Sequence, residues 1–134
     1  MTRKQAREQA FALVFEKSFH DEPMEDIIRA AKDARELAES EFAEQAARGV
    51  YDHLAEIDAK IEANIRGWKI SRVSRVALAV MRLAVYEMLF DKSIPVSVSI
   101  NEAVELAKQY GGPDDASYIN GVLGSVARAL EGDA

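Results

Sequence analysis

Residues 93–124 read SIPVSVSINEAVELAKQYGGPDDASYINGVLG, and they contain the clearest helix signals in the chain. Ser99 and Glu102 have the S-x-x-E spacing of a capping box, in which the hydroxyl and the carboxylate each bind a free backbone N–H. We therefore predict an extended lead-in up to Ser99 and a helix from Ile100 onward. The apolar residues that follow recur at i, i+3, i+4 and i+7 and so form one helix face: Ile100, Ala103, Val104 and Ala107.

A stop signal, Gly-Gly-Pro at residues 111–113, follows this helix. A glycine favours the left-handed cap that ends many helices, and a proline cannot continue one. Asp114 or Asp115 can then cap a last helix, from Ala116 to about Leu130, because a short carboxylate accepts the first free N–H groups. The stretch therefore predicts two helices joined by a tight turn.

The rest of the chain has the same helical character. Its three prolines lie between apolar-periodic segments, which are rich in helix formers such as alanine, leucine, glutamate and arginine. Periodicity predicts five further helices, over Thr2–Phe19, Met24–Ala31, Asp33–Glu44, residues 50–67 and Val73–Phe90. We therefore expect an all-α fold, a compact bundle of about seven helices. A chain of 134 residues should form one domain, or two small sub-bundles that share a core.

The composition excludes several classes of function. The chain has no cysteine, which excludes disulfides, thiolate metal sites and a cysteine nucleophile. The only histidines, His20 and His53, lack the further ligands that a metal site needs. No phosphate-binding glycine loop, G-x-S-x-G or H-E-x-x-H motif occurs, so we expect no enzyme activity, metal or cofactor. Without a signal peptide or an apolar run long enough to cross a bilayer, we expect a soluble, cytoplasmic protein outside the membrane.

The first predicted helix carries a cationic and aromatic edge. Arg3, Lys4 and Arg7 lie at its N-terminal end, and Phe11 and Phe15 follow. In one interpretation the first turn extends beyond the core, the cations are solvated and the phenylalanines are buried. In the other, the cations bind phosphates and the rings stack on the bases of a single-stranded nucleic acid. The net charge of −6 argues only weakly against the second interpretation, because it does not locate a local basic patch.

A second group of cations recurs every third residue around Trp68: Arg66, Lys69, Arg72 and Arg75. These residues can contact a polyanion. Alternatively, they provide favourable charge at a helix C-terminus, before a helix capped by Ser71.

The predicted helix at 73–90 is apolar on nearly every face. This pattern is typical either of a helix at the centre of a bundle or of one partly covered by another protein. An exposed apolar strip on this helix could serve a homodimer as well as a different partner.

The stretch quoted first strongly resembles the C-terminal signature of the NusB family of bacterial transcription antitermination factors. Its most specific parts are the I-N-E-A-V-E-L-A-K run, the G-G turn and the I-N-G-V-L run. Upstream, V-M-R-L-A-V-Y-E-M-L resembles the central helix of the family, and R-K-x-x-R-E-x-A with Phe15 resembles its first helix. The resemblance extends from Arg3 to Leu130 and implies two packed three-helix-type sub-bundles, residues 1–67 and 68–134.

This resemblance implies a non-catalytic factor that binds the boxA RNA element of ribosomal RNA leader transcripts together with NusE, a small-subunit ribosomal protein. The complex would then join NusA, NusG and RNA polymerase. RNA contacts are implied at the cations Arg3, Lys4 and Arg7, at the aromatic residues Phe15, Tyr110 and Tyr118, and at Asp114 in the turn. The residues alone identify the edge of the first helix, whereas they leave Tyr110 and Tyr118 undecided between core and surface.

The resemblance also implies a surface for NusE near the apolar helix at 73–90. We place this partner-binding surface at Ala77, Val80, Met81 and Val85. An alternative function is a helical adaptor of the same fold that binds protein with little or no RNA binding. An RNA-methyltransferase accessory domain is disfavoured, because such a domain precedes a large cofactor-binding domain.

Three positions depart from the common pattern of the family. Ser117 occupies the place of a lysine, Gly124 that of an aspartate, and Ala77 that of an acidic residue. We therefore expect RNA affinity to depend on the protein partner.

Overall fold

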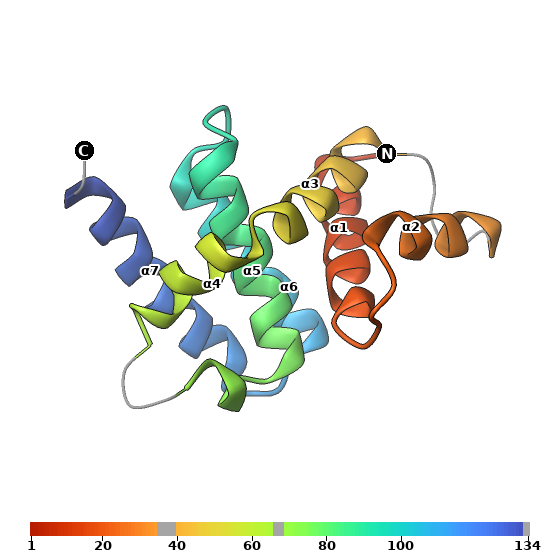
Figure 1. Cartoon of the computed structure of the whole chain (residues 1–134). Helices are drawn as coiled ribbons and strands as arrows, with labels where there is room; N and C mark the ends of the chain where they lie inside the picture. The colour runs from red at the N-terminus through yellow and green to blue at the C-terminus, as the bar shows by residue number, and fades with distance from the viewer. Residues whose placement is uncertain (35–39, 66–68, 133–134) are drawn as a thin grey trace.

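The computed structural model describes residues 1–34, 40–65 and 69–132, and all the regular structure in these ranges is helical (Figure 1). The elements are α1 (Arg3–Lys17), α2 (Met24–Asp33), α3 (Glu41–Asp52), α4 (Leu54–Glu62), the 3₁₀ turn η1 (Ile70–Arg72), α5 (Arg75–Phe90), α6 (Val96–Tyr110) and α7 (Asp115–Gly132). The predicted all-α fold is confirmed. Within the described residues, no helix is both long and apolar enough to span a membrane.

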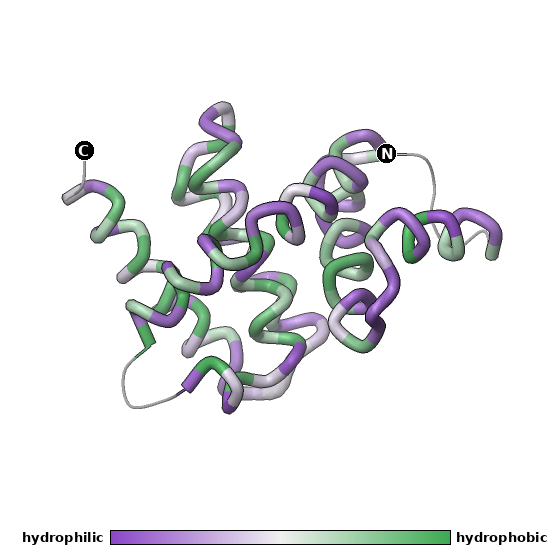
Figure 2. The backbone as a smooth tube through the Cα atoms, in the orientation of Figure 1, coloured by the Kyte–Doolittle hydropathy of each residue, from purple (hydrophilic) through white to green (hydrophobic). Residues whose placement is uncertain are grey.

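Helix α5 lies at the centre of the bundle, and α1, α3, α4, α6 and α7 all pack against it. Figure 2 shows hydrophobic residues along its length. The predicted partner-binding side chains are at most 1% exposed: Ala77, Val80, Met81 and Val85. That prediction is therefore wrong, because the apolar character of α5 reflects burial among other helices. These four side chains therefore do not form an exposed strip for a homodimer either.

The start of α6 also differs from the prediction. The helix begins at Val96, directly after Pro95, whose φ of −59° suits a helix start. Ser99 is buried, and its hydroxyl donates to Glu87 Oε1 on α5 at 2.8 Å. The predicted capping box and extended lead-in are therefore wrong, because this tertiary hydrogen bond occupies the hydroxyl.

Gly111 ends α6 with a φ of −100°, so it does not form the predicted left-handed cap. A Cβ atom at this position would lie 2.7 Å from Asp115 Oδ2 and 2.8 Å from the Ala107 carbonyl oxygen. Close packing therefore requires a glycine here. Asp115 Oδ2 also accepts the Gly112 N–H at 2.9 Å, which fixes the turn at the start of α7.

Some predicted boundaries are shifted. The helix predicted over 50–67 is interrupted at His53, so α3 and α4 are separate helices. The cap of α5 is Ser74 rather than Ser71, because the Ser74 hydroxyl accepts a backbone N–H three residues later at 3.1 Å. Parts of three predictions lie outside the described residues: the middle of the helix predicted over 33–44, the sub-bundle boundary between 67 and 68, and Arg66 and Trp68 of the second cation group.

Candidate nucleic-acid interface

A capping box fixes the N-terminus of α1. The Thr2 hydroxyl accepts the Gln5 N–H at 3.1 Å, and Gln5 Oε1 accepts the Thr2 N–H at 2.9 Å. This cap places Arg3 and Lys4 in an exposed first turn. The Arg3 guanidinium stacks on the Phe42 ring, 4.0 Å from its centre, and neither cation has a carboxylate partner among the described residues. Both charges are therefore available to an anion.

Arg7 does not belong to this exposed edge. Its side chain is buried, with 5% of the residue exposed. Arg7 Nε donates to Glu87 Oε2 at 2.9 Å, and its Nη2 donates to Glu87 Oε1 at 3.0 Å. Because Glu87 neutralises the guanidinium inside the protein, the expected phosphate contact at Arg7 is corrected to an internal ion pair between α1 and α5.

Four aromatic rings form a continuous series, which we call the aromatic row: Tyr110, Phe11, Phe15 and Phe19. Neighbouring ring centres are 5.1, 5.8 and 5.0 Å apart in that order. The row is buried at Phe11 and half-buried at Phe15, and it ends in the exposed rings of Tyr110 (44%) and Phe19 (52%). Phe19 was not predicted as a site residue; it lies in the turn that follows α1, where its ring contacts that of Phe15.

Tyr110 closes the row at the C-terminal end of α6. Its hydroxyl donates to Glu8 Oε2 on α1 at 3.3 Å. Partial burial, and then the neighbouring Glu8 carboxylate, raise the pKa of the Tyr110 hydroxyl. The group therefore stays protonated at neutral pH, and the ring presents a neutral face for stacking.

Asp114 and Tyr118 lie together in a second part of the surface, which we call the turn cleft. This cleft of about 350 Å³ lies between the start of α5 and the turn before α7. Arg72 lines it with them, and so does Ser74, which directly precedes the Arg75 that stacks on Phe19. The cleft and the Phe19 end of the aromatic row therefore adjoin the same first turn of α5.

The Tyr118 ring packs against the core, and its hydroxyl is buried without a hydrogen-bond partner in the described structure. Burial raises the pKa of this hydroxyl.

Because an unsatisfied buried polar group costs stability, we expect Tyr118→Phe to raise the free energy of unfolding by about 1 kcal/mol in urea titrations. Tyr51→Phe is the matched control. The Tyr51 hydroxyl donates to the Val14 carbonyl oxygen at 3.1 Å, so its loss should lower the free energy of unfolding. A destabilising Tyr118→Phe would contradict the unpaired hydroxyl.

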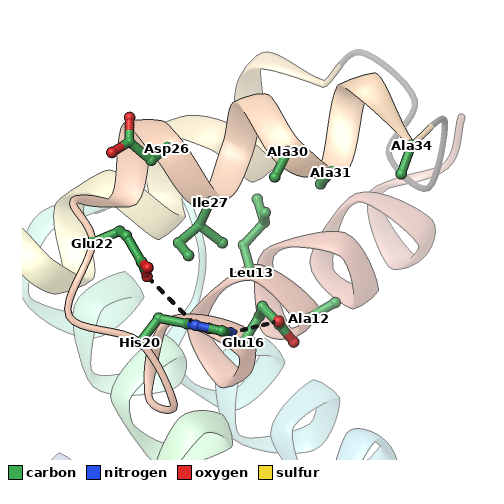
Figure 3. A pocket seen from close by; sticks show the side chains of 10 residues that line it. All are labelled: Ala12, Leu13, Glu16, His20, Glu22, Asp26, Ile27, Ala30, Ala31 and Ala34. Atoms are coloured by element: carbon green, nitrogen blue, oxygen red, sulfur yellow. Dashed lines mark hydrogen bonds and ion pairs between the residues drawn. The ribbon is translucent and has the colours of Figure 1, made fainter.

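A further cavity of about 760 Å³ lies between α1 and α2 (Figure 3). Its walls are partly apolar, and at one end the His20 ring lies between Glu16 at 2.9 Å and Glu22 at 3.4 Å. Asp26 adds a further carboxylate to the lining. This acidic end disfavours a polyanion, so the cavity is not the nucleic-acid interface. In the described part of the chain, no three His, Cys, Asp or Glu side chains are grouped as a metal site would require.

Comparisons with known proteins identify close relatives. The model of the NusB family matches residues 4–128. The transcription antitermination protein NusB of Clostridium acetobutylicum is 41% identical over 133 residues, which cover 98% of each chain. Among solved structures, T. maritima NusB matches with a TM-score of 0.83 and 34% identity, covering 96% of this chain and 92% of that one. A crystal structure of antitermination factors NusB and NusE in complex with dsRNA matches with a TM-score of 0.84 and 26% identity, covering 95% and 96%.

Proposed function

The chain belongs to the NusB family of transcription antitermination proteins, as its sequence predicted, and on this premise we propose that it binds boxA RNA of ribosomal RNA transcripts together with NusE. The carrying observation is that the exposed cations Arg3 and Lys4 lie on α1, the helix that also carries two of the four rings of the aromatic row, Phe11 and Phe15. Free cations beside exposed rings are the combination that binds a single strand. A solved relative that holds NusB, NusE and dsRNA supports RNA and NusE as the partners.

Each site residue has a distinct role in this proposal. Arg3 and Lys4 neutralise phosphates, and Tyr110 with the edge of Phe15 supplies stacking surface. In the turn cleft, Tyr118 packs beside a base, and the exposed Asp114 carboxylate accepts a base N–H. A carboxylate repels phosphates, so Asp114 faces base edges rather than the backbone.

The wider assembly extends the same proposal. The protein is non-catalytic and acts in the cytoplasm on nascent RNA, and its complex joins NusA, NusG and RNA polymerase. NusE binds a surface other than the four buried side chains of α5.

The deciding experiment measures binding of a labelled boxA oligonucleotide to this protein, with and without purified NusE, at two salt concentrations. Binding that is tighter with NusE and weaker at high salt supports the proposal. The alternative result is that NusE binds the protein equally well with and without RNA, while RNA binds neither the protein alone nor the protein with NusE. That result identifies a protein-binding adaptor. Failure to bind either partner overturns both functions.

Replacing Arg3 and Lys4 together with alanine should weaken RNA binding and flatten its salt dependence. Each lost phosphate contact on a single strand lowers the slope of log K against log salt by about 0.7, so the double variant should lose about 1.4. Arg3→Ala should have the larger effect, because Lys4 lines a crevice with the carboxylates of Glu8, Glu102 and Glu105. The control replaces two exposed cations elsewhere, Lys92 and Arg128. An unchanged slope in the Arg3 and Lys4 variant would refute the cationic edge.

A further inference from the structure

The turn that follows α1 places an exposed ring beside cations. Phe19 is half exposed, and its ring meets Phe15 edge to face at 79°. The guanidinium carbon of Arg75, from the first turn of α5, lies 4.5 Å from the centre of the Phe19 ring. The aromatic row therefore ends in a ring paired with a cation at this end.

Arg75 is held in place without being neutralised. Its Nη1 donates to the Ser18 carbonyl oxygen at 2.7 Å, and no described carboxylate pairs with it. A carbonyl acceptor fixes the direction of the guanidinium but leaves its full charge. The remaining N–H groups of Arg75 can therefore donate to an incoming anion.

Lys17 provides a second uncompensated charge beside Arg75. Its Nζ donates to the His20 carbonyl oxygen at 3.0 Å and lies 5.2 Å from the centre of the Tyr51 ring. Like Arg75, it has no carboxylate partner among the described residues. Neither the carbonyl nor the ring neutralises the ammonium, so it is available to an anion.

Both cations line one cleft of about 410 Å³, which we call the cationic cleft. The hydroxyl-bearing residues Ser18, Ser71 and Tyr51 line it too. Arg82 also lines it but is neutralised, because it forms two hydrogen bonds of 2.9 Å to the Asp58 carboxylate. The His20 ring pairs with Glu16 and Glu22, which face the cavity of Figure 3. The excess charge of the cationic cleft is therefore positive, in a chain whose net charge is −6.

The chemistry of this end matches one class of ligand. A phosphate fits between the Lys17 ammonium and the Arg75 guanidinium, and the Ser71 hydroxyl can donate to its oxygens. The Ser18 and Tyr51 hydroxyls already donate to the Phe15 and Val14 carbonyl oxygens. A base fits against the exposed Phe19 ring or the guanidinium plane beside it. A small free anion would explain the cations, but it would leave the exposed ring without a role. A nucleotide of a single strand uses both.

We propose that the RNA continues along α1 beyond the boxA contacts and that a flanking nucleotide binds at Phe19, Arg75 and Lys17. This inference rests on the proposed function, in which boxA contacts extend from Arg3 and Lys4 to Phe15 and the turn cleft. Helix α1 has 15 residues, so its first and last cations are about 21 Å apart along the axis. At roughly 3.4 Å per stacked nucleotide, that distance corresponds to about six nucleotides. The cationic cleft is thus within reach of a modest flanking segment.

The experiment compares three RNAs by fluorescence anisotropy: boxA alone, boxA with about six unstructured flanking nucleotides added at the 5′ end, and boxA with the same number added at the 3′ end. Wild-type protein should bind one of the extended RNAs at least about fivefold more tightly than boxA alone. Phe19→Ala and Arg75→Ala should each abolish most of this gain while binding boxA alone as wild type does. Arg75→Ala should also lower the salt slope by about 0.7 for the extended RNA only.

Phe90→Ala and Arg128→Ala are the matched controls. Phe90 is an exposed ring at the other end of α5, about 22 Å from Arg75, and Arg128 is an exposed cation on α7. Both variants should keep the full gain. The inference is overturned if extension adds nothing for wild type, if both test variants keep the gain, or if the controls lose it equally. Failure of wild type to bind boxA alone, with or without NusE, would instead count against the proposed function.

Discussion

Replacing Glu87 with alanine is expected to lower the free energy of unfolding by about 3–5 kcal/mol. Glu87 is 2% exposed, and it accepts two hydrogen bonds from Arg7 and one from Ser99. Its removal leaves the Arg7 charge and the Ser99 hydroxyl buried without partners. Urea unfolding monitored by circular dichroism gives the measurement.

The control for this loss removes the whole buried network. A triple variant with Arg7→Met, Glu87→Leu and Ser99→Ala should recover stability to within about 1 kcal/mol of wild type, since an apolar replacement leaves no unpaired group. Asp26→Ala tests an ion pair with Arg29 on the surface, and it should change stability by no more than about 1 kcal/mol. If Glu87→Ala lowers the free energy of unfolding no more than Asp26→Ala does, the ion pair of Arg7 and Glu87 does not stabilise the packing of α1 on α5.

The same triple variant tests whether Arg7 contacts RNA. With Arg7 confined to the interior, the variant should keep the salt slope of wild-type RNA binding. A salt slope of RNA binding that is lower by about 0.7 would show instead that Arg7 contacts a phosphate, together with Arg3 and Lys4.

The role of Arg7 shows where prediction from the sequence ends. Its place at the N-terminal end of the first predicted helix suggested a cation that is either solvated or bound to a phosphate. Its partner, Glu87, lies 80 residues away, so only the packing of α1 on α5 could reveal that Arg7 is buried. Ser99 was misassigned for the same reason, because a local capping signal competed with a hydrogen bond to another helix.

Helical periodicity was sufficient for most of the fold, since apolar spacing and helix caps are local properties of the chain. Burial of α5 was predicted as one of two alternatives, and the structure selects the bundle centre. The candidate site was predicted less fully. Phe15 was identified from the sequence. The positions of Tyr110 beside Phe11 and of Arg75 over Phe19 were not, because they depend on how separate helices pack.

Replacing Tyr110 with alanine is expected to weaken RNA binding by about 1–3 kcal/mol, or roughly 5- to 150-fold. Tyr110 is the exposed ring of the aromatic row nearest to Arg3 and Lys4 in the proposed RNA path, and a base can stack on its free area. Because the ring is 44% exposed, its loss should leave the helical circular dichroism signal close to that of wild type.

Tyr110→Phe separates stacking from hydrogen bonding in this effect. The variant keeps the ring and its contact with Phe11, and it loses only the hydroxyl that donates to Glu8. Its RNA affinity should stay within about a factor of two of wild type, because stacking does not need the hydroxyl. If Tyr110→Phe weakens RNA binding as much as Tyr110→Ala does, the hydroxyl rather than the ring contacts RNA. If neither substitution matters, RNA does not reach this end of the aromatic row, and the base contacts must come from the turn cleft with Asp114 and Tyr118.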